Sequence, residues 1–276
     1  MEKVILVIID GLSYRTKKYM GFLEALKSEN LTDSYKVQSG YPSLSRPLYE
    51  EILTGVSPVN SGIVNNEIKR LSKEESVFSL AVKNGKKTAA AAYYWVNELY
   101  NTGGFDRIRD SETENEMANI NYGRFYWEDN FPDTHLFVQG EILRKKYNPD
   151  FLLIHSMNVD DIGHKFGGTS SEYIDSARKI SDILSALVPN WIKEGYQIII
   201  TSDHGMSKLG NHGGISPDET LVPMWLIGDK IRKRKLKKDM QGKISQKIIA
   251  PLCCEMMNIK KSQRMVDIEY EETTEK

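Results

Sequence analysis

Two of the chain's five histidines lie close together in the stretch 201–214, TSDHGMSKLGNHGG, and an aspartate directly precedes the first of them. Imidazole nitrogens and carboxylate oxygens ligate divalent metal ions. An aspartate that orients a histidine is also part of a catalytic triad. Asp203, His204 and His212 are therefore candidates for a metal site or a catalytic dyad, and a polar turn is the alternative without chemistry.

Two further acidic positions follow short apolar runs. Asp10 comes directly after VILVII (4–9), and Asp160 follows FLLIHSM (151–157). Asp160 is four residues before His164, and Gly163 between them permits a tight turn, so that both side chains can reach one ion. Taken alone, Asp10 is more typical of a turn or a helix cap, and the loop around Asp160 fits a solvated acidic loop equally well.

Together the clusters supply six metal-ligating side chains, namely Asp10, Asp160, Asp203, His164, His204 and His212. A Ser-His-Asp triad would use only one aspartate and one histidine. Six ligands are too many for one tetrahedral ion, but they suit two ions ~3.5–4 Å apart, the arrangement used in phosphoryl transfer. The mixture of oxygen and nitrogen ligands favours Zn²⁺, with Mn²⁺ or iron as alternatives.

A further polar cluster, residues 39–67, contains Ser43 and Ser45 just before a helix-like segment that ends at Thr54-Gly55. A serine at a helix N-terminus has its oxygen near unpaired backbone N–H groups and the positive end of the helix dipole. Such a serine is a candidate nucleophile. Taken alone, it more simply caps the helix.

Alternating strand-like and helix-like segments predict the fold. Apolar runs of strand length occur at 4–9, 87–94, 151–157, 196–202 and 222–228. Helix-like segments occur at about 17–29, 72–84, 132–147, 170–190 and 242–257. This order predicts one doubly wound α/β domain over residues 1–276, with a mostly parallel central sheet and helices on both faces. Ligands of such sheets bind beyond the carboxyl ends of the strands, where Asp10, Asp160 and Asp203 would converge.

Three stretches fall outside this alternation. The polar stretch 97–131 is interpreted as a cap insertion over one end of the sheet. The basic run KIRKRKLKK (230–238) could bind anionic lipid or RNA, but a solvated loop or helix face is the simpler interpretation. The tail 267–276 is acidic and is expected to be frayed.

Composition excludes several classes of protein. The formal net charge is −1, so nucleic acid is not expected as a required partner. No apolar run is long enough for a membrane span, and 4–9 is too short for a signal peptide core. The adjacent Cys253 and Cys254 could pair only in a strained disulfide, so two core thiols in a reducing compartment are expected. We therefore expect a cytoplasmic protein, and its oligomeric state stays open.

The ordered set of motifs resembles the alkaline phosphatase superfamily, and within it the type I phosphodiesterase/nucleotide pyrophosphatase group. In chain order these motifs are Asp10-Gly11, PSLSRP, LTG, SGIVNN, DDIGH, SDHGM and NHGG. They lie between residues 4 and 228. Each motif is short, and the specificity lies in their order.

The resemblance implies a role for each candidate residue. It assigns one ion to Asp160, His164 and His212, and the other ion to Asp10, Asp203, His204 and the nucleophile Ser45. Ser45 is preferred to Ser43 because the family places its nucleophile two residues before the second proline, here Pro47. Asn66 matches an asparagine that contacts a non-bridging phosphate oxygen, together with the backbone N–H next to Ser45.

The sequence departs from the family pattern beside the nucleophile. Ser45 replaces the threonine that is usual in the phosphodiesterase group, and Arg46 stands where nucleotide-cleaving members commonly carry an aromatic residue. Arg46 is expected either to contact a second phosphate or a carboxylate of the substrate, or to face solvent. A sulfatase is excluded, because it needs an arginine at the position of Tyr49.

These features predict a two-metal phosphohydrolase that cleaves a phosphodiester or pyrophosphate bond of a small molecule through a phosphoseryl intermediate. Phosphomonoesterase, phosphonate hydrolase and phosphotransferase activities are alternatives within the superfamily. A non-catalytic metal-binding scaffold is the alternative from a different class. That alternative predicts a missing ligand or nucleophile, and none is missing.

Overall fold

The computed structural model describes residues 3–272, in which nine strands form one mixed sheet. The strands are β1 (Lys3–Ile9), β2 (Thr32–Gln38), β3 (Thr88–Tyr93), β4 (Glu112–Glu114), β5 (Tyr122–Tyr126), β6 (Phe151–Ser156), β7 (Tyr196–Thr201), β8 (Leu221–Ile227) and β9 (Lys243–Ser245). Their order across the sheet is β4-β5-β3-β6-β1-β7-β8-β2-β9. Strand β1 pairs in parallel with β6 and β7, whereas β8 is antiparallel to both β7 and β2. The sheet is therefore mostly parallel, as predicted.

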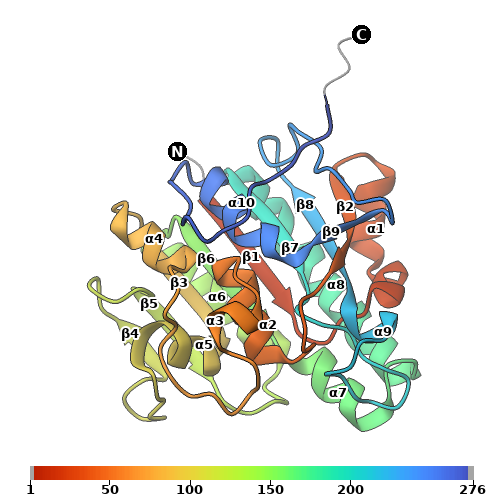
Figure 1. Cartoon of the computed structure of the whole chain (residues 1–276), viewed down its shortest axis with the longest axis horizontal. Coiled ribbons are helices and arrows are strands. Elements are labelled where there is room, and N and C mark those ends of the chain that lie inside the picture. Colours follow the sequence, from red (N-terminus) through yellow and green to blue (C-terminus); the bar gives the residue numbers. More distant parts are fainter. Residues whose placement is uncertain (1–2, 273–276) are drawn as a thin grey trace.

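Helices cover both faces of this sheet (Figure 1). The α-helices are α1 (Gly21–Ser28), α2 (Ser45–Thr54), α3 (Pro58–Ser61), α4 (Val77–Lys83), α5 (Trp95–Asn97), α6 (Asp133–Tyr147), α7 (Asn158–Phe166), α8 (Ser171–Lys193), α9 (Pro217–Thr220) and α10 (Ile249–Met256). Two short 3-10 helices, η1 (Tyr14–Tyr19) and η3 (Gln246–Ile248), and one π-helix, η2 (Glu98–Thr102), complete the helical elements. The doubly wound α/β prediction is confirmed.

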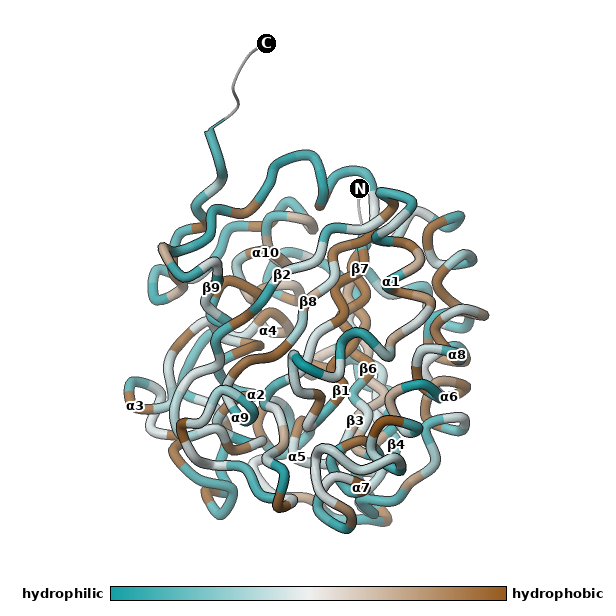
Figure 2. The backbone as a smooth tube through the Cα atoms, turned by 90° about the vertical axis from the view of Figure 1, so that its right-hand side faces the viewer, coloured by the Kyte–Doolittle hydropathy of each residue, from teal (hydrophilic) through white to brown (hydrophobic). Residues whose placement is uncertain are grey.

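Two hydrophobic cores lie on opposite faces of the sheet. Alternate side chains of β1 enter different cores, Val4, Leu6 and Ile8 on one face and Ile5, Val7 and Ile9 on the other. Helices α2, α4 and α10 pack on the first face, and α1, α6 and α8 pack on the second. Because β1 is buried on both sides, it reads as a continuous apolar run, and Figure 2 shows the central strands largely in brown.

Cys253 and Cys254 are free and buried, and both belong to the first core. Burial raises the pKa of both thiols, to about 12 for Cys254. The interpretation of this pair as core side chains is therefore consistent with the structure.

The strands that the sequence did not predict are β2, β4, β5 and β9, all on the outer parts of the sheet. Strand β2, TDSYKVQ, has only two apolar residues, Tyr35 and Val37, so it contains no apolar run. The segment 242–257 was expected to be one helix. It begins instead with β9 and η3, and only Ile249–Met256 is α-helical.

The interpretation of 97–131 as a cap over one end of the sheet needs correction. Strand β5 pairs in parallel with β3, and β4 pairs with β5, so the second half of this stretch widens the sheet at its edge. Tyr122, Phe125 and Tyr126 are buried there. Strand β5 has only five residues, and the polar composition of the surrounding stretch 97–131 hid so short a strand from the sequence analysis.

The expectation of a frayed tail over 267–276 is wrong for its first part. The backbone N–H of Lys237 donates to Glu269, and the N–H of Glu271 donates to Lys235. The basic run 230–238 is thus an irregular segment that pairs with the chain end. Residues 273–276 lie outside the described part of the chain. Within the described residues, no helix has the length and apolar character needed to cross a membrane.

Candidate active site

The seven residues predicted to bind the two ions, Ser45 included, converge at the carboxyl end of the parallel strands. Asp10 directly follows β1, and Asp203 lies two residues beyond β7, the strand paired with β1. The arrowhead of β1 points to the end of the sheet where α7 lies (Figure 1). We call Asp10, Ser45, Asp203 and His204 the inner cluster, and Asp160, His164 and His212 the outer cluster.

The inner cluster is buried and closely spaced around one imidazole nitrogen. His204 Nε2 lies 3.0 Å from Ser45 Oγ, 3.3 Å from Asp203 Oδ2 and 3.4 Å from Asp10 Oδ1. Ser45 is the first residue of α2 and follows the N-cap residue, Leu44. The Ser45 hydroxyl faces the cluster. The simpler interpretation, that Ser45 caps the helix, is therefore wrong.

The outer cluster is held by α7 and by the loop after β7. The glycine turn expected between Asp160 and His164 is absent, because residues 158–166 are α-helical. Four residues of helix place both side chains on the same face, with His164 Nε2 3.2 Å from Asp160 Oδ2. His212 Nε2 lies 3.1 Å from His164 Nε2 and 3.8 Å from Asp160 Oδ1. Gly163 is needed for packing, since an added Cβ would lie 2.8 Å from Met206 Cε.

All three imidazoles present the same nitrogen to the clusters. Their Nδ1 atoms lie at hydrogen-bond distance from backbone carbonyls: His164 from Gly210 at 2.8 Å, His204 from Gly205 at 3.0 Å, and His212 from Ser43 at 2.9 Å. Because a carbonyl oxygen can only accept, each Nδ1 carries the hydrogen, and each neutral ring has its lone pair on Nε2. The Nε2 lone pairs of His164 and His212 then face each other, which is favourable only with a proton or a cation between them.

The carboxylates also have free acceptor positions that are buried. Asp10 Oδ1, Asp160 Oδ1 and Asp203 Oδ2 have no hydrogen-bond partner. Burial raises the pKa of Asp10 well above its usual value, and the charge of Asp160 adds to this. Burial and the charge of Asp10 raise the pKa of Asp203 in the same way. Buried polar atoms without partners are rare, and a positive charge nearby would stabilise the ionised form of the three carboxylates.

The histidines show how each cluster would accept that charge. Burial, with the charge of His212, lowers the pKa of His204 to about 3, which keeps His204 neutral as metal ligands require. The hydrogen bond to Asp160 raises the pKa of His164 to about 9. Burial works to raise the pKa of Asp160, but the hydrogen bond from His164 and the nearby histidine charges bring it below its usual value.

These donors fit two divalent cations. Ligand atoms of Asp10, Asp203 and His204 lie within 4.8 Å of one another, and so do those of Asp160, His204 and His212. His204 belongs to both groups and therefore stands between the two clusters. The residues fit the two-ion arrangement because unpaired oxygens and Nε2 lone pairs meet in the same small volume.

The geometry does not fit a Ser-His-Asp triad. In a triad, the aspartate accepts from the histidine nitrogen opposite to the one that faces the serine. Here Asp10 and Asp203 both lie on the Nε2 side of His204, the same side as Ser45, and Nδ1 is bonded to a backbone carbonyl.

Ser43 and Asn66 support the nucleophile loop in different ways. Ser43 Oγ donates to the carbonyl of Gly214 at 2.7 Å, and its own carbonyl accepts from His212. Ser43 therefore positions an outer ligand, whereas Ser45 faces the inner cluster. Asn66 Oδ1 accepts from the backbone N–H of Arg46 at 3.1 Å. The Asn66 side chain and the Arg46 N–H were expected to contact phosphate together. They are adjacent, as this requires, but here they form a hydrogen bond with each other.

Arg46 does not face solvent. Its side chain is fully buried, Nη2 donates to Glu98 Oε2 at 2.6 Å, and the guanidinium lies 4.6 Å from the Trp95 ring centroid. The Nε and Nη1 atoms have no hydrogen-bond partner. The ion pair with Glu98 and the stacking on Trp95 hold the Arg46 side chain inside the protein. The expectation that it faces solvent is wrong, whereas contact with a substrate phosphate or carboxylate stays a prediction.

Sequence reasoning missed two buried residues that contact Asp10. The Tyr49 hydroxyl donates to Asp10 Oδ2, and His155 Nε2 lies 3.3 Å from the same oxygen. Burial lowers the pKa of His155 to about 3, so this ring is neutral. His155 is a polar residue inside the apolar run of β6, and that interruption was the only signal in the sequence.

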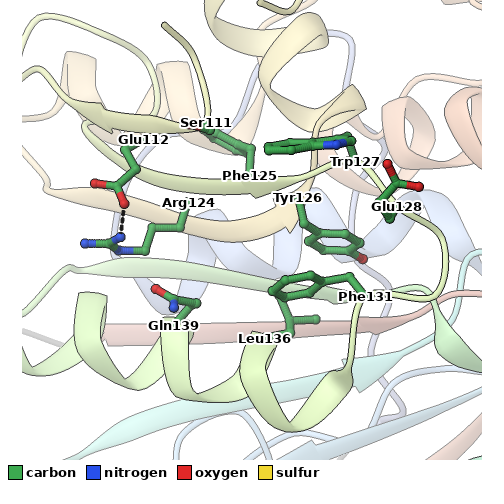
Figure 3. Close-up of a pocket in the computed structure, with 10 residues that line it drawn as sticks. All are labelled: Ser111, Glu112, Arg124, Phe125, Tyr126, Trp127, Glu128, Phe131, Leu136 and Gln139. Atoms are coloured by element: carbon green, nitrogen blue, oxygen red, sulfur yellow. Dashed lines mark hydrogen bonds and ion pairs between the residues drawn. The ribbon is translucent and has the colours of Figure 1, made fainter. Parts of the chain in front are cut away.

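A cavity of about 240 Å³ lies between β5 and α6 (Figure 3). Phe125, Trp127 and Phe131 form much of its wall, and none of the seven predicted site residues lines it. Tyr126, which also lines it, donates to the carbonyl of His155 at 2.9 Å. The cavity is therefore connected to the clusters through Tyr126 but is separate from them.

The chain is similar to known proteins both in sequence and in fold. Residues 4–229 match the model of the type I phosphodiesterase / nucleotide pyrophosphatase family. The chain belongs to this family. Inactive murine ectonucleotide pyrophosphatase / phosphodiesterase 5 in complex with AMP has a similar fold, with a TM-score of 0.73, 12% identity and coverage of 95% of this chain and 96% of that chain. Alkaline phosphatase from the Antarctic bacterium TAB5 gives a TM-score of 0.58 and 13% identity, with coverage of 94% and 98%. The fold is that of the alkaline phosphatase superfamily.

The curated relatives carry a different name. GPI ethanolamine phosphate transferase 2 of Yarrowia lipolytica is 33% identical over 207 residues, which are 73% of this chain and 23% of that protein. Relatives of the same name in other organisms are matched over similar lengths, and the chain spans 23% to 31% of the length of the curated relatives compared. The chain is thus similar both to proteins named as transferases and to proteins named as phosphodiesterases.

Proposed function

We propose that the chain is a two-metal phosphohydrolase that cleaves a phosphodiester or pyrophosphate bond of a small molecule. The observation that carries this proposal is the position of Ser45 Oγ, 3.0 Å from His204 Nε2 and beside buried carboxylate oxygens that have no partner. A hydroxyl among metal-ligating groups, at the start of a helix, is well placed to act as the nucleophile toward an anionic substrate.

The chain's own residues would divide the work as follows. Ser45 Oγ attacks phosphorus, the bond from phosphorus to the leaving oxygen breaks, and the phosphoryl group stays on Ser45 as an ester. The Asn66 amide and the N–H of Arg46, which lie together at the start of α2, would donate to the non-bridging oxygens after their mutual hydrogen bond opens. Two divalent ions, with Zn²⁺ favoured, would lower the pKa of Ser45 and offset negative charge on the attacking and leaving oxygens.

The second step distinguishes hydrolysis from transfer. Attack of water on the phosphoryl-Ser45 ester releases a phosphate product and restores the hydroxyl, whereas attack of an alcohol transfers the group. The similarity to GPI ethanolamine phosphate transferase 2 supports transfer as the second candidate. Both reactions would use the same site residues and differ in the acceptor.

A substrate panel tests the proposal. Chelated protein reloaded with Zn²⁺ or Mn²⁺ is assayed with bis-p-nitrophenyl phosphate, p-nitrophenyl phosphate, a nucleotide ester and a phosphonate. We expect metal-dependent turnover with preference for the diester or the nucleotide ester. Preference for the monoester or the phosphonate would contradict the diesterase assignment and favour those activities. Adding glycerol as acceptor separates the second step, since a transferase forms glycerol adducts and a hydrolase forms only the water product.

A further inference from the structure

The two oxygens of Asp10 have different surroundings. Oδ1 has no hydrogen-bond partner and lies 3.4 Å from His204 Nε2, inside the inner cluster. Oδ2 accepts from the Tyr49 hydroxyl and lies 3.3 Å from His155 Nε2 on the opposite side. One oxygen is therefore held by side chains outside the cluster, and the other is left for a ligand inside it.

The hydrogen on His155 can be placed from its second nitrogen. The backbone N–H of Tyr93 donates to His155 Nδ1 at 3.4 Å, so Nδ1 is an acceptor. A neutral imidazole has one N–H, which must then be on Nε2. His155 Nε2 consequently donates to Asp10 Oδ2, and this oxygen receives two hydrogen bonds from buried side chains.

Both donors are fixed by their own contacts. The ring of Tyr49 packs edge-on against His155, with 4.6 Å between centroids and an interplanar angle of 69°. The His155 carbonyl accepts from Tyr126 at 2.9 Å. Tyr49 lies on α2, about one helical turn after Ser45, while His155 lies on β6. The pair therefore connects the helix that carries the nucleophile to the strand next to β1.

We propose that Tyr49 and His155 are positioning residues for the inner ion. By saturating Asp10 Oδ2, they turn Oδ1 toward His204 and Ser45 and stop the carboxylate from rotating away. This inference rests on the proposed function, because it assigns the pair to a metal ligand. Residues that orient metal ligands typically contribute ~10–100-fold to metal affinity.

Matched tyrosine variants test this proposal. Tyr49→Phe removes only the hydroxyl that donates to Asp10. Tyr100→Phe removes a hydroxyl that donates to Glu50 Oε2 at 2.9 Å and to the backbone carbonyl of Tyr49 at 3.5 Å, from a ring that is also buried. It leaves the hydrogen bond from the Tyr49 hydroxyl to Asp10 in place. Chelated wild type and both variants are titrated with Zn²⁺ in competition with a chromogenic chelator, and thermal unfolding is measured on the same samples. His155→Gln, which keeps an N–H donor, and His155→Leu, which removes it, form a second pair.

We expect wild type and Tyr100→Phe to bind two ions with equal affinities. Tyr49→Phe should bind one ion normally and the other ~10–100-fold more weakly. His155→Leu should resemble Tyr49→Phe, and His155→Gln should recover part of the loss. A combination of Tyr49→Phe with His164→Ala should bind no ion at a Zn²⁺ concentration at which each single variant binds one.

Two results separate the possible failures. If wild type binds two ions and Tyr49→Phe binds both with unchanged affinities, the positioning role is wrong and the proposed function stands. If folded wild type binds no ion, the proposed function fails and the positioning role fails with it. Equal weakening of both ions in Tyr49→Phe and Tyr100→Phe would show a general loss of stability and would also overturn the inference.

Discussion

The inner and outer clusters use the same kinds of ligand in different surroundings. Asp10, Asp203 and His204 of the inner cluster are fully buried, whereas the side chain of His164 in the outer cluster is 45% exposed. Of the inner carboxylates, Asp10 directly follows β1 and Asp203 lies two residues beyond β7. The outer ligands lie on α7 and on a loop. The more deeply buried cluster is thus the one that contains the nucleophile.

This difference bears on how each ion would be held. In the inner cluster, Gly11 N–H donates to Asp203 Oδ1 at 3.2 Å, and Asp10 Oδ2 is bonded to two buried side chains. Gly11 itself has φ +73, and an added Cβ would lie 2.8 Å from Asp160 Cα. The outer cluster relies on backbone carbonyls that orient its histidines. We therefore expect the inner ion to exchange slowly and the outer ion to be more accessible.

Ser45→Ala should have the largest effect, because Ser45 is the only nucleophile assigned to the inner cluster. Removing a nucleophile typically costs ~10⁶-fold in kcat. Both ions should stay bound, since six protein ligands remain. Turnover of the best substrate and metal content by mass spectrometry check this outcome, with the exposed Ser185→Ala on α8 as the control that leaves both unchanged. Substantial turnover by Ser45→Ala would assign the chemistry to another group.

Asp203→Asn and His164→Ala test the contrast between the two clusters. Asp203→Asn should lower turnover roughly 10³-fold or more, because it removes an ion ligand next to the nucleophile. His164→Ala should release the outer ion at a lower chelator concentration and leave the inner ion bound. The comparison is made by following metal release during chelator titration. If the inner cluster loses its ion first in the wild-type protein, the proposed difference between the two clusters is wrong.

Asn66→Ala should reduce kcat by ~10²–10³-fold with the metal content unchanged, as expected for one lost donor to a developing negative charge. Its neighbour Asn65 is exposed and bonds only locally to the N–H of Glu67, so Asn65→Ala is the matched control. Separate measurements of kcat and KM decide the result. An effect on KM alone would place Asn66 in ground-state binding.

Asp133→Asn should have the smallest effect, on stability alone. Asp133 is a buried carboxylate outside both clusters, and burial raises its pKa from 3.8 to about 7. The carboxyl of Asp133 keeps its proton to a higher pH in the folded protein than in the unfolded chain. Its contribution to the free energy of unfolding is therefore fully present below pH ~4 and is lost as the pH rises through ~7. The contribution of Asp133 to the free energy of unfolding should fall by up to about 4 kcal/mol across this window. Unfolding of Asp133→Asn should show a flatter dependence, and an equal slope in both proteins would contradict this account.

The sequence predicted which ligand-type residues lie together better than it predicted the elements around them, for physical reasons. Asp10, Asp160, Asp203 and the histidines follow strands that are buried on both faces, and such strands are visible as apolar runs. Ser45 was identified through motif order. Strand β5 and the helical form of residues 158–166 were missed, because a short edge strand and a glycine-containing helix lack a clear period.

Contacts between distant residues could not be predicted from spacing. Arg46 was expected at the substrate or in solvent, and its partner Glu98 is 52 positions away in the chain. Tyr49 meets Asp10 across 39 positions, and His155 meets it across 145. Only the packed fold brings these side chains together.

Metal content of the purified protein tests the two-cluster account most directly. The protein is expressed with added Zn²⁺, freed of loosely bound metal by gel filtration, and analysed by inductively coupled plasma mass spectrometry alongside circular dichroism. The account predicts about two transition-metal ions per chain, and about one in His164→Ala. A well-folded protein that contains no transition metal, and gains none on dialysis against Zn²⁺ or Mn²⁺, would contradict it.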